Sequence, residues 1–297
     1  MPRLGPNGGP ASIDLLDLIK TTITVAGFVG AVLVGVYGYR KQRLAEGDAR
    51  RADVEQLAQR YTTAAGQLGH EKAAVRLAGV YAMARLADDW DEQRRQVCLD
   101  VLCAYLRMPY EPDTASEKHR EGEREVRYTI IGIIRDHLRD PSAPTTWCGL
   151  DLDFTNATFD GGDFTGVKFT GGEVSFQRAV FTGGEVFFDR AGFAGGTVSF
   201  VEAEFAGGGV SFEGAVFTGG SVIFVSAEFV GGDVSFAHAK FTGGDVSFGN
   251  TRFTGGKVSF YGAEYAPGCS INWGPLEPRT AWTELQERER RQNEPPP

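Results

Sequence analysis

A twelve-residue phrase, repeated eight times between residues 169 and 264, constrains this chain more than any other feature. The phrase reads F-[TAV]-G-G-x-V-x-F-x-x-[AG]-x with a few departures. Self-similarity at a short fixed period is typical of a solenoid, in which each unit buries its apolar side against its neighbours. The sequence therefore predicts a repeat architecture, although it identifies neither a partner nor a pathway.

Each unit carries two pairs of apolar residues that are expected to point inward. A small residue stands two positions before each phenylalanine, as in Val174-x-Phe176 and Ala179-x-Phe181, so both members lie on the same side of a strand. Burial of the rings, at about 2 kcal/mol each before entropy is subtracted, is sufficient to hold such a tower together. The predicted structural core consists of Phe169, Phe176, Phe181, Phe188, Phe193, Phe200, Phe205, Phe212, Phe217, Phe224, Phe229, Phe236, Phe241, Phe248, Phe253 and Phe260.

A Gly-Gly pair recurs in every unit and is predicted to form a corner, because glycine accepts the positive φ of a sharp bend. The first two pairs are Gly171–Gly172 and Gly183–Gly184. Two coil lengths remain open: 24 residues with four faces, or 12 residues with two. Interior volume favours 24, since a two-faced coil must fit its phenylalanine pair between sheets only about 10 Å apart.

The lead-in to the repeat, LDF-TN-ATF-DG-GDF-TG-VKF, places Phe154, Phe159, Phe164 and Phe169 at five-residue intervals. It resembles the pentapeptide-repeat family, which implies a right-handed, four-sided β-helix with five residues per face. The later spacing of five and seven departs from the family pattern, and two extra residues at alternate corners explain it most simply. With VRLAGVYAMARLADD, VLCAYLRMPYEP and WCGLDLDF, most of residues 15–270 resembles membrane-anchored bacterial pentapeptide-repeat proteins, a resemblance that implies no known activity.

Residues 21–39 contain no charged side chain and are predicted to form a transmembrane helix, because a helix of this length spans about 28 Å. A signal peptide is the alternative, but the apolar run is too long and no small-residue cleavage site follows. Basic residues after the span place the C-terminal domains in the cytoplasm and the N-terminus outside, in a single-pass cell-membrane protein. Gly27, Ala31 and Gly35 form a small-residue stripe that is a candidate for helix packing in a homodimer.

The expected fold class is an N-terminal transmembrane helix and a small α-helical domain, followed by an all-β right-handed β-helix. Helical periodicity predicts one helix ending near Gly69 and three more at about 71–87, 92–107 and 125–139. The helical unit is expected to cover the open end of the solenoid. The predicted domains are a disordered N-terminus (1–17), the transmembrane helix (18–40), a helical cap domain (44–140), the β-helix (147–273), and a C-terminal cap helix and tail (274–297).

No catalytic, cofactor-binding or metal-binding residues are predicted, and no enzymatic activity or cofactor is expected. Phosphate-loop, zinc-protease and nucleophile-elbow motifs are missing from the sequence, and the Gly-Gly pairs are periodic corners. The four cysteines, which follow no metal-binding or redox spacing, are interpreted as reduced thiols packed as small apolar groups.

The sequence favours a noncatalytic, membrane-tethered cytosolic scaffold that binds an unidentified protein partner, with the lipid bilayer contacted through one span. Residues 150–268 carry fourteen acidic against six basic residues, so direct nucleic-acid binding is not expected. The alternative is a DNA-mimic regulator of a type II topoisomerase, which the resemblance and the acidic solenoid suggest. Six interspersed basic side chains and the membrane tether weigh against this alternative.

Overall fold

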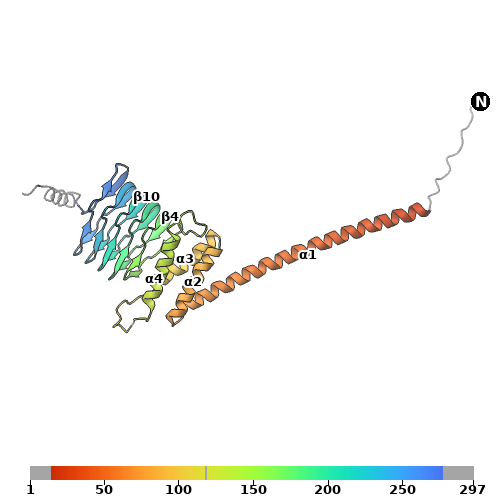
Figure 1. Ribbon diagram of the computed structural model, residues 1–297, viewed down its shortest axis with the longest axis horizontal. Helices are drawn as coiled ribbons and strands as arrows, with labels where there is room; N and C mark the ends of the chain where they lie inside the picture. Colours follow the sequence, from red (N-terminus) through yellow and green to blue (C-terminus); the bar gives the residue numbers. More distant parts are fainter. Residues whose placement is uncertain (1–14, 118, 277–297) are drawn as a thin grey trace, which may run out of the picture. The chain divides into compact units, whose positions relative to one another are not determined.

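The computed structural model describes residues 15–117 and 119–276 (Figure 1). The chain divides into two compact units, Met1–Gln59 and Arg60–Pro297, which are described separately. The predicted disordered N-terminus lies outside the described residues up to position 14. Most of the predicted C-terminal cap helix and tail also lies outside them, from position 277 onward.

Helix α1 spans Leu15–Leu68 without a break. The predicted fold class was wrong in its transmembrane helix at residues 18–40: among the described residues, no helix combines the length and apolarity needed to cross a bilayer.

The end of α1 packs with three further helices, α2 (Ala73–Asp89), α3 (Glu92–Arg107) and α4 (Glu123–His137). The expected span of α3 is confirmed, and α3 begins where the Asp91 carboxylate accepts a hydrogen bond from the Arg94 backbone N–H at 3.1 Å. Apolar side chains spaced one helical turn apart face a common core. Its fully buried members include Val80, Met83, Leu99, Leu102, Ile130 and Ile134.

The second part of the unit is a β-solenoid built from three parallel sheets (Figure 1). Sheet A contains β1 (Leu152–Asp153), β4 (Lys168–Ser175), β7 (Gly192–Ser199), β10 (Val216–Ile223), β13 (Lys240–Ser247), β16 (Glu264–Tyr265) and β17 (Cys269–Asn272). Sheet B contains β2 (Thr158–Phe159), β5 (Val180–Phe181), β8 (Glu204–Phe205), β11 (Glu228–Phe229) and β14 (Arg252–Phe253). Sheet C contains β3 (Gly162–Asp163), β6 (Glu185–Phe187), β9 (Gly209–Ser211), β12 (Asp233–Ser235) and β15 (Val258–Ser259).

The strand register confirms the favoured 24-residue coil. Phe169 pairs with Phe193 and Val174 with Val198, each one full coil apart. The first coil is shorter, since Phe159 pairs with Phe181 after 22 residues. The difference arises because the lead-in keeps five-residue spacing at a corner where later coils have seven.

The phenylalanine rings stack in four columns along the solenoid interior. Successive rings in a column lie 4.6 to 5.3 Å apart between centroids, and rings from neighbouring columns meet edge to face, as Phe188 and Phe200 do at 88°. Both geometries are favourable for aromatic pairs. At the far end, Trp273 meets Phe260 edge to face at 5.2 Å and closes part of the last layer.

The Gly-Gly pairs occupy two different kinds of corner. Gly171 and Gly172 lie within β4, where the strand of sheet A continues around the corner, whereas Gly183 and Gly184 lie in the turn between sheets B and C. In seven of the eight pairs the second glycine has positive φ, as at Gly172 (70°) and Gly184 (27°). Consecutive coils also approach closely there: a Cβ on Gly172 would lie 2.6 Å from the Leu150 carbonyl oxygen.

We predict that Gly196→Ala strongly destabilises the solenoid. Gly196 has φ of 68°, and a Cβ there would lie 2.3 Å from the Gly172 carbonyl oxygen. The left-handed backbone alone costs alanine about 1–3 kcal/mol, and the clash adds to this cost. Gly183→Ala is the matched control, because its Cβ would have no neighbour within 4 Å. Denaturant unfolding monitored by circular dichroism measures both; equal stability of the two variants would contradict the prediction.

Candidate functional site

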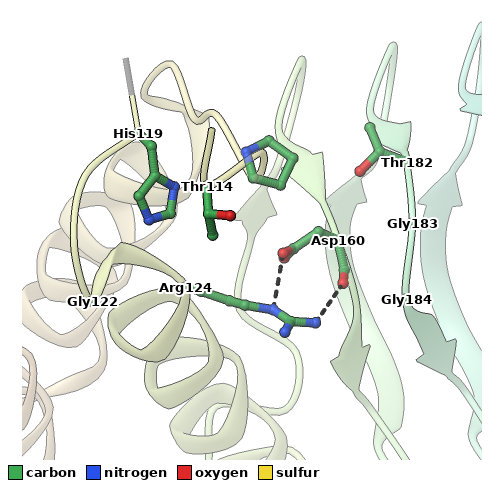
Figure 2. A pocket seen from close by; sticks show the side chains of 9 residues that line it. Thr114, His119, Gly122, Arg124, Asp160, Thr182, Gly183 and Gly184 are labelled. Carbon is green, nitrogen blue, oxygen red and sulfur yellow. Dashed lines mark hydrogen bonds and ion pairs between the residues drawn. The ribbon is translucent and has the colours of Figure 1, made fainter. Parts of the chain in front are cut away.

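A pocket of about 560 Å³ opens where the helical unit meets the first coils of the solenoid (Figure 2). Its walls come from the segment between α3 and α4, from the start of α4 and from the corners of two coils. The first coil turns this corner with two residues fewer than the second. The Thr182–Gly184 segment of the second coil lies against Asp160, since a Cβ on Gly184 would be 2.1 Å from the Asp160 carbonyl oxygen. The lining residues are Pro112, Thr114, His119, Gly122, Arg124, Asp160, Thr182, Gly183 and Gly184.

Asp160 is the polar centre of this junction. Its carboxylate accepts a hydrogen bond from the Tyr110 hydroxyl at 2.8 Å and pairs with the Arg124 guanidinium at 3.0 Å. Its backbone carbonyl accepts bonds from the Tyr128 hydroxyl at 3.1 Å and from Arg124 at 3.4 Å, as the dashed lines from Arg124 show in Figure 2. Gly161 permits this approach, because a Cβ there would lie 2.0 Å from the Tyr128 oxygen.

A second contact of the same kind lies on sheet C. Arg135 of α4 pairs with the Asp163 carboxylate, which also accepts a bond from the Thr165 backbone N–H at 2.8 Å. Partial burial raises the pKa of Asp163, but the bonds from Thr165 and Arg135 outweigh burial and leave that pKa below its ordinary value. The carboxylate is therefore ionised at neutral pH and holds α4 against the first coil.

A buried cluster of charged side chains holds the start of α4 in place. Arg76, which is fully buried, lies 3.3 Å from the Glu123 carboxylate and donates to backbone carbonyls of Glu71 and Glu121. Tyr105 donates to Glu123 at 2.9 Å; burial and the Glu123 charge raise the pKa of Tyr105 to about 12. Arg127 stacks over Tyr110 at 4.4 Å and donates to the Leu106 and Thr158 carbonyls.

The polar side chains at this junction hold the helical unit and the solenoid together. Asp160 and Arg124 neutralise each other, and Tyr110 and Tyr128 direct their hydroxyl groups into the same contact. His119 directs Nδ1 at the Glu111 carbonyl oxygen at 3.2 Å. Within the described ranges, no three His, Cys, Asp or Glu side chains form a cluster that would hold a metal ion.

The cysteines are free thiols in the described structure, and Cys98 and Cys103 lie buried in the helical unit. Burial raises the pKa of Cys98 to about 12, so that this thiol is protonated at neutral pH.

The sequence-predicted core residues all lie inside the solenoid except Phe253, whose side chain is 37% exposed. Phe253 stacks on Phe229 at 4.8 Å but ends its column, because β14 is the last strand of sheet B in the described structure. The structure also adds a core layer before the repeat, formed by Phe154, Phe159 and Phe164 with Phe169.

The stripe proposed for membrane-helix packing is only partly described. The side chains of Gly27 and Ala31 lie outside the described residues. Gly35 is exposed, and a Cβ there would meet nothing within 4 Å in the part of the chain that the structure describes. Self-association through this stripe stays a prediction.

Sequence reasoning missed Asp160 and its partners. Tyr110 stands next to Pro109 in a stretch without periodicity, Arg124 and Tyr128 lie on the polar side of α4, and Asp160 is an ordinary turn residue in the lead-in. The one available signal was the five-residue spacing at the Asp160 corner, against seven in later coils. That difference in spacing marks the corner at which the pocket forms.

Comparison with protein-family models, with curated proteins and with solved structures finds no match to this chain. What the structure itself shows is a β-solenoid whose phenylalanines are regularly spaced, at five residues in the lead-in, which is consistent with pentapeptide repeats.

We predict that Asp160→Ala destabilises the junction by about 1–3 kcal/mol, because the Tyr110 hydroxyl loses a part-buried acceptor and Arg124 loses its ion-pair partner. Thermal and denaturant unfolding, with proteolysis after Arg124 as a local readout, measures the effect. The control is Glu213→Ala, which removes an exposed carboxylate at a solenoid turn. The prediction is wrong if both variants unfold at the wild-type midpoint.

Proposed function

We propose that the chain is a noncatalytic scaffold of the pentapeptide-repeat type, whose solenoid presents its outer surface to a protein partner. The single observation that carries the proposal is the in-register stacking of outward residues in successive coils. Ser211, Ser235 and Ser259 follow one another in sheet C, and Ser175, Ser199 and Ser247 share a position in sheet A. A partner would thus meet columns of side chains held on a ladder of backbone hydrogen bonds.

Rigidity supports the proposal physically. The outward side chains alternate with fully buried valines and phenylalanines, and ring columns fix each coil on the next. A surface that does not have to be ordered on binding loses less conformational entropy. Such a surface suits recognition of a folded protein better than it suits chemistry, which needs convergent reactive groups in a pocket.

The DNA-mimic alternative stays a prediction that the surface charges do not favour. Ion pairs join acidic and basic residues of neighbouring coils: Arg178 with Glu202 at 3.9 Å, Lys240 with Glu264 at 3.1 Å, and Arg252 with Glu228 at 3.4 Å. These pairs break the acidic surface into local neutral spots, whereas duplex DNA carries an unbroken row of negative charge. The cytoplasmic placement of the C-terminal domains and the bacterial origin likewise stay predictions.

The test is to identify neighbours of the full-length chain by proximity labelling in cells and to measure their binding to the purified full-length chain. We expect at least one labelled protein to bind saturably, and a lysine at an outward solenoid position to weaken that binding at least tenfold. A lysine replacing Glu117 in the helical unit is the control, because this exposed side chain lies outside the solenoid. If no labelled protein binds saturably, or if both lysines act alike, the proposal fails.

A further inference from the structure

The pocket at the junction lies where the first coil lacks two residues. The first coil passes from Phe159 to Phe164 in five residues, whereas the second passes from Phe181 to Phe188 in seven. The Gly-Gly pair that accounts for the difference lines the cavity together with Thr182. The corner of the second coil therefore has no Gly-Gly pair before it to pack against.

The three later corners between sheets B and C that the structure describes show which group normally occupies this space. In each, the first glycine of the pair lies so close to the preceding coil that a Cβ would clash with a backbone carbonyl oxygen there. The same glycine also donates its N–H to a phenylalanine carbonyl of that coil. These hydrogen bonds join Gly207 to Phe181 at 3.1 Å, Gly231 to Phe205 at 3.2 Å and Gly255 to Phe229 at 3.3 Å.

Gly183, the equivalent residue of the second coil, has neither contact. A Cβ there would meet nothing within 4 Å, and its N–H has no acceptor among the residues that the structure describes. The equivalent acceptor, the Phe159 carbonyl, accepts instead from the backbone N–H and the hydroxyl of Thr182, at 2.9 and 3.4 Å. Backbone N–H groups require a partner, so water or a ligand must supply an acceptor to Gly183.

Arg124 provides a second open donor in the same cavity. Its Nε pairs with the Asp160 carboxylate at 3.0 Å, and its Nη2 donates to the Tyr128 hydroxyl at 3.1 Å. Its Nη1 has no partner in the part of the chain that the structure describes, and the side chain is 58% exposed. Figure 2 shows Asp160 between Arg124 on one side and the Thr182–Gly184 segment on the other. An open guanidinium N–H favours a carboxylate acceptor.

We propose that this cavity binds the C-terminal end of an extended peptide. A backbone carbonyl of the peptide accepts the Gly183 N–H, as the Phe181 carbonyl accepts the Gly207 N–H one coil later. The terminal carboxylate of the peptide pairs with Nη1 of Arg124. A volume of about 560 Å³ suits a ligand of this size. The inference is independent of the proposed function, because the cavity lies at the junction and not on the outward faces of the later coils.

The charge of the cavity selects a ligand with a single negative charge. Asp160 and Arg124 already neutralise each other, so a phosphate group with nearly two negative charges would be repelled by the Asp160 carboxylate. The Tyr110 hydroxyl, at 2.8 Å, and Nε of Arg124 hold that carboxylate and reduce its repulsion of a ligand. Ion pairs of exposed side chains contribute little, so binding is expected in the millimolar range.

Titration of the full-length chain, labelled with ¹⁵N-glycine, with N-acetyl-glycyl-glycine tests the site by NMR. The Gly183 signal is identified by its loss in Gly183→Ala, whose Cβ has open space. We expect the free acid to shift this signal saturably. The C-terminal amide of the same peptide should bind at least tenfold more weakly, because it offers Arg124 no charge. Absence of a saturable shift, or equal binding of acid and amide, would overturn the inference.

Acetate separates a peptide from a small carboxylate. It carries the carboxylate but no amide carbonyl for Gly183, so it should bind at least tenfold more weakly than N-acetyl-glycyl-glycine. Acetate that binds as tightly as the peptide would refute the contact with the Gly183 N–H.

Substitution of Arg124 tests the carboxylate contact. Arg124→Gln should weaken binding of the free acid at least tenfold and leave binding of the amide unchanged. The matched control is Arg135→Gln: Arg135 lies on the same helix and pairs with Asp163 of the first coil, but it does not line the cavity. If both variants weaken binding alike, the loss reflects a loosened junction and the inference fails. A failed search for partners of the outer solenoid surface leaves these outcomes unaffected.

Discussion

Stacking of phenylalanine rings between successive coils is the contact on which the rest of the solenoid depends. Each ring lies about one strand spacing above the previous one, so the interval that forms backbone hydrogen bonds between parallel strands also brings aromatic faces into contact. Both interactions form only when each face of a coil lies directly above the same face of the coil before it. This coupling explains why the 24-residue register persists from Phe169 to Tyr265.

This register brings the backbones of successive coils very close together at the corners. Glycine is required at the second position of seven of the eight pairs because φ is positive there, and at Gly195 because a Cβ would lie 2.4 Å from the Thr170 carbonyl oxygen. The tighter corners tolerate other residues: Arg178, Glu202 and His238 also have positive φ, at 54° to 56°. Their side chains point to solvent, so only local backbone strain opposes them.

The junction between helices and solenoid is held by polar contacts, unlike the repeat, which is held by stacked rings. It depends on paired charges: Arg76 and Glu123 are buried together, whereas the exposed Arg124 side chain pairs with the largely buried carboxylate of Asp160. Buried ion pairs contribute less to stability than their number suggests, but loss of one partner is costly. The pairs of Arg124 with Asp160 and of Arg135 with Asp163 join α4 to the first coil, so they form only when the two lie side by side.

The sequence by itself determined the periodic part of this protein: the inward phenylalanines, the glycine corners and, from interior volume, the coil length. Each depends on residues whose spacing matches the geometry of a strand or a turn. The transmembrane helix expected at residues 18–40 is the exception, since no helix among the described residues is both long and apolar enough to cross a bilayer.

Only the tertiary structure decided which non-periodic residues meet. Tyr110, Arg124 and Asp160 belong to three segments, and no pattern in the chain relates them until α4 lies on the first coil. The exposure of Phe253 was decided in the same way, because its repeat is as regular as the others and only its place in the last strand of sheet B leaves the ring uncovered. Periodicity specifies what each unit buries, whereas contacts at the ends depend on the neighbours that the fold supplies.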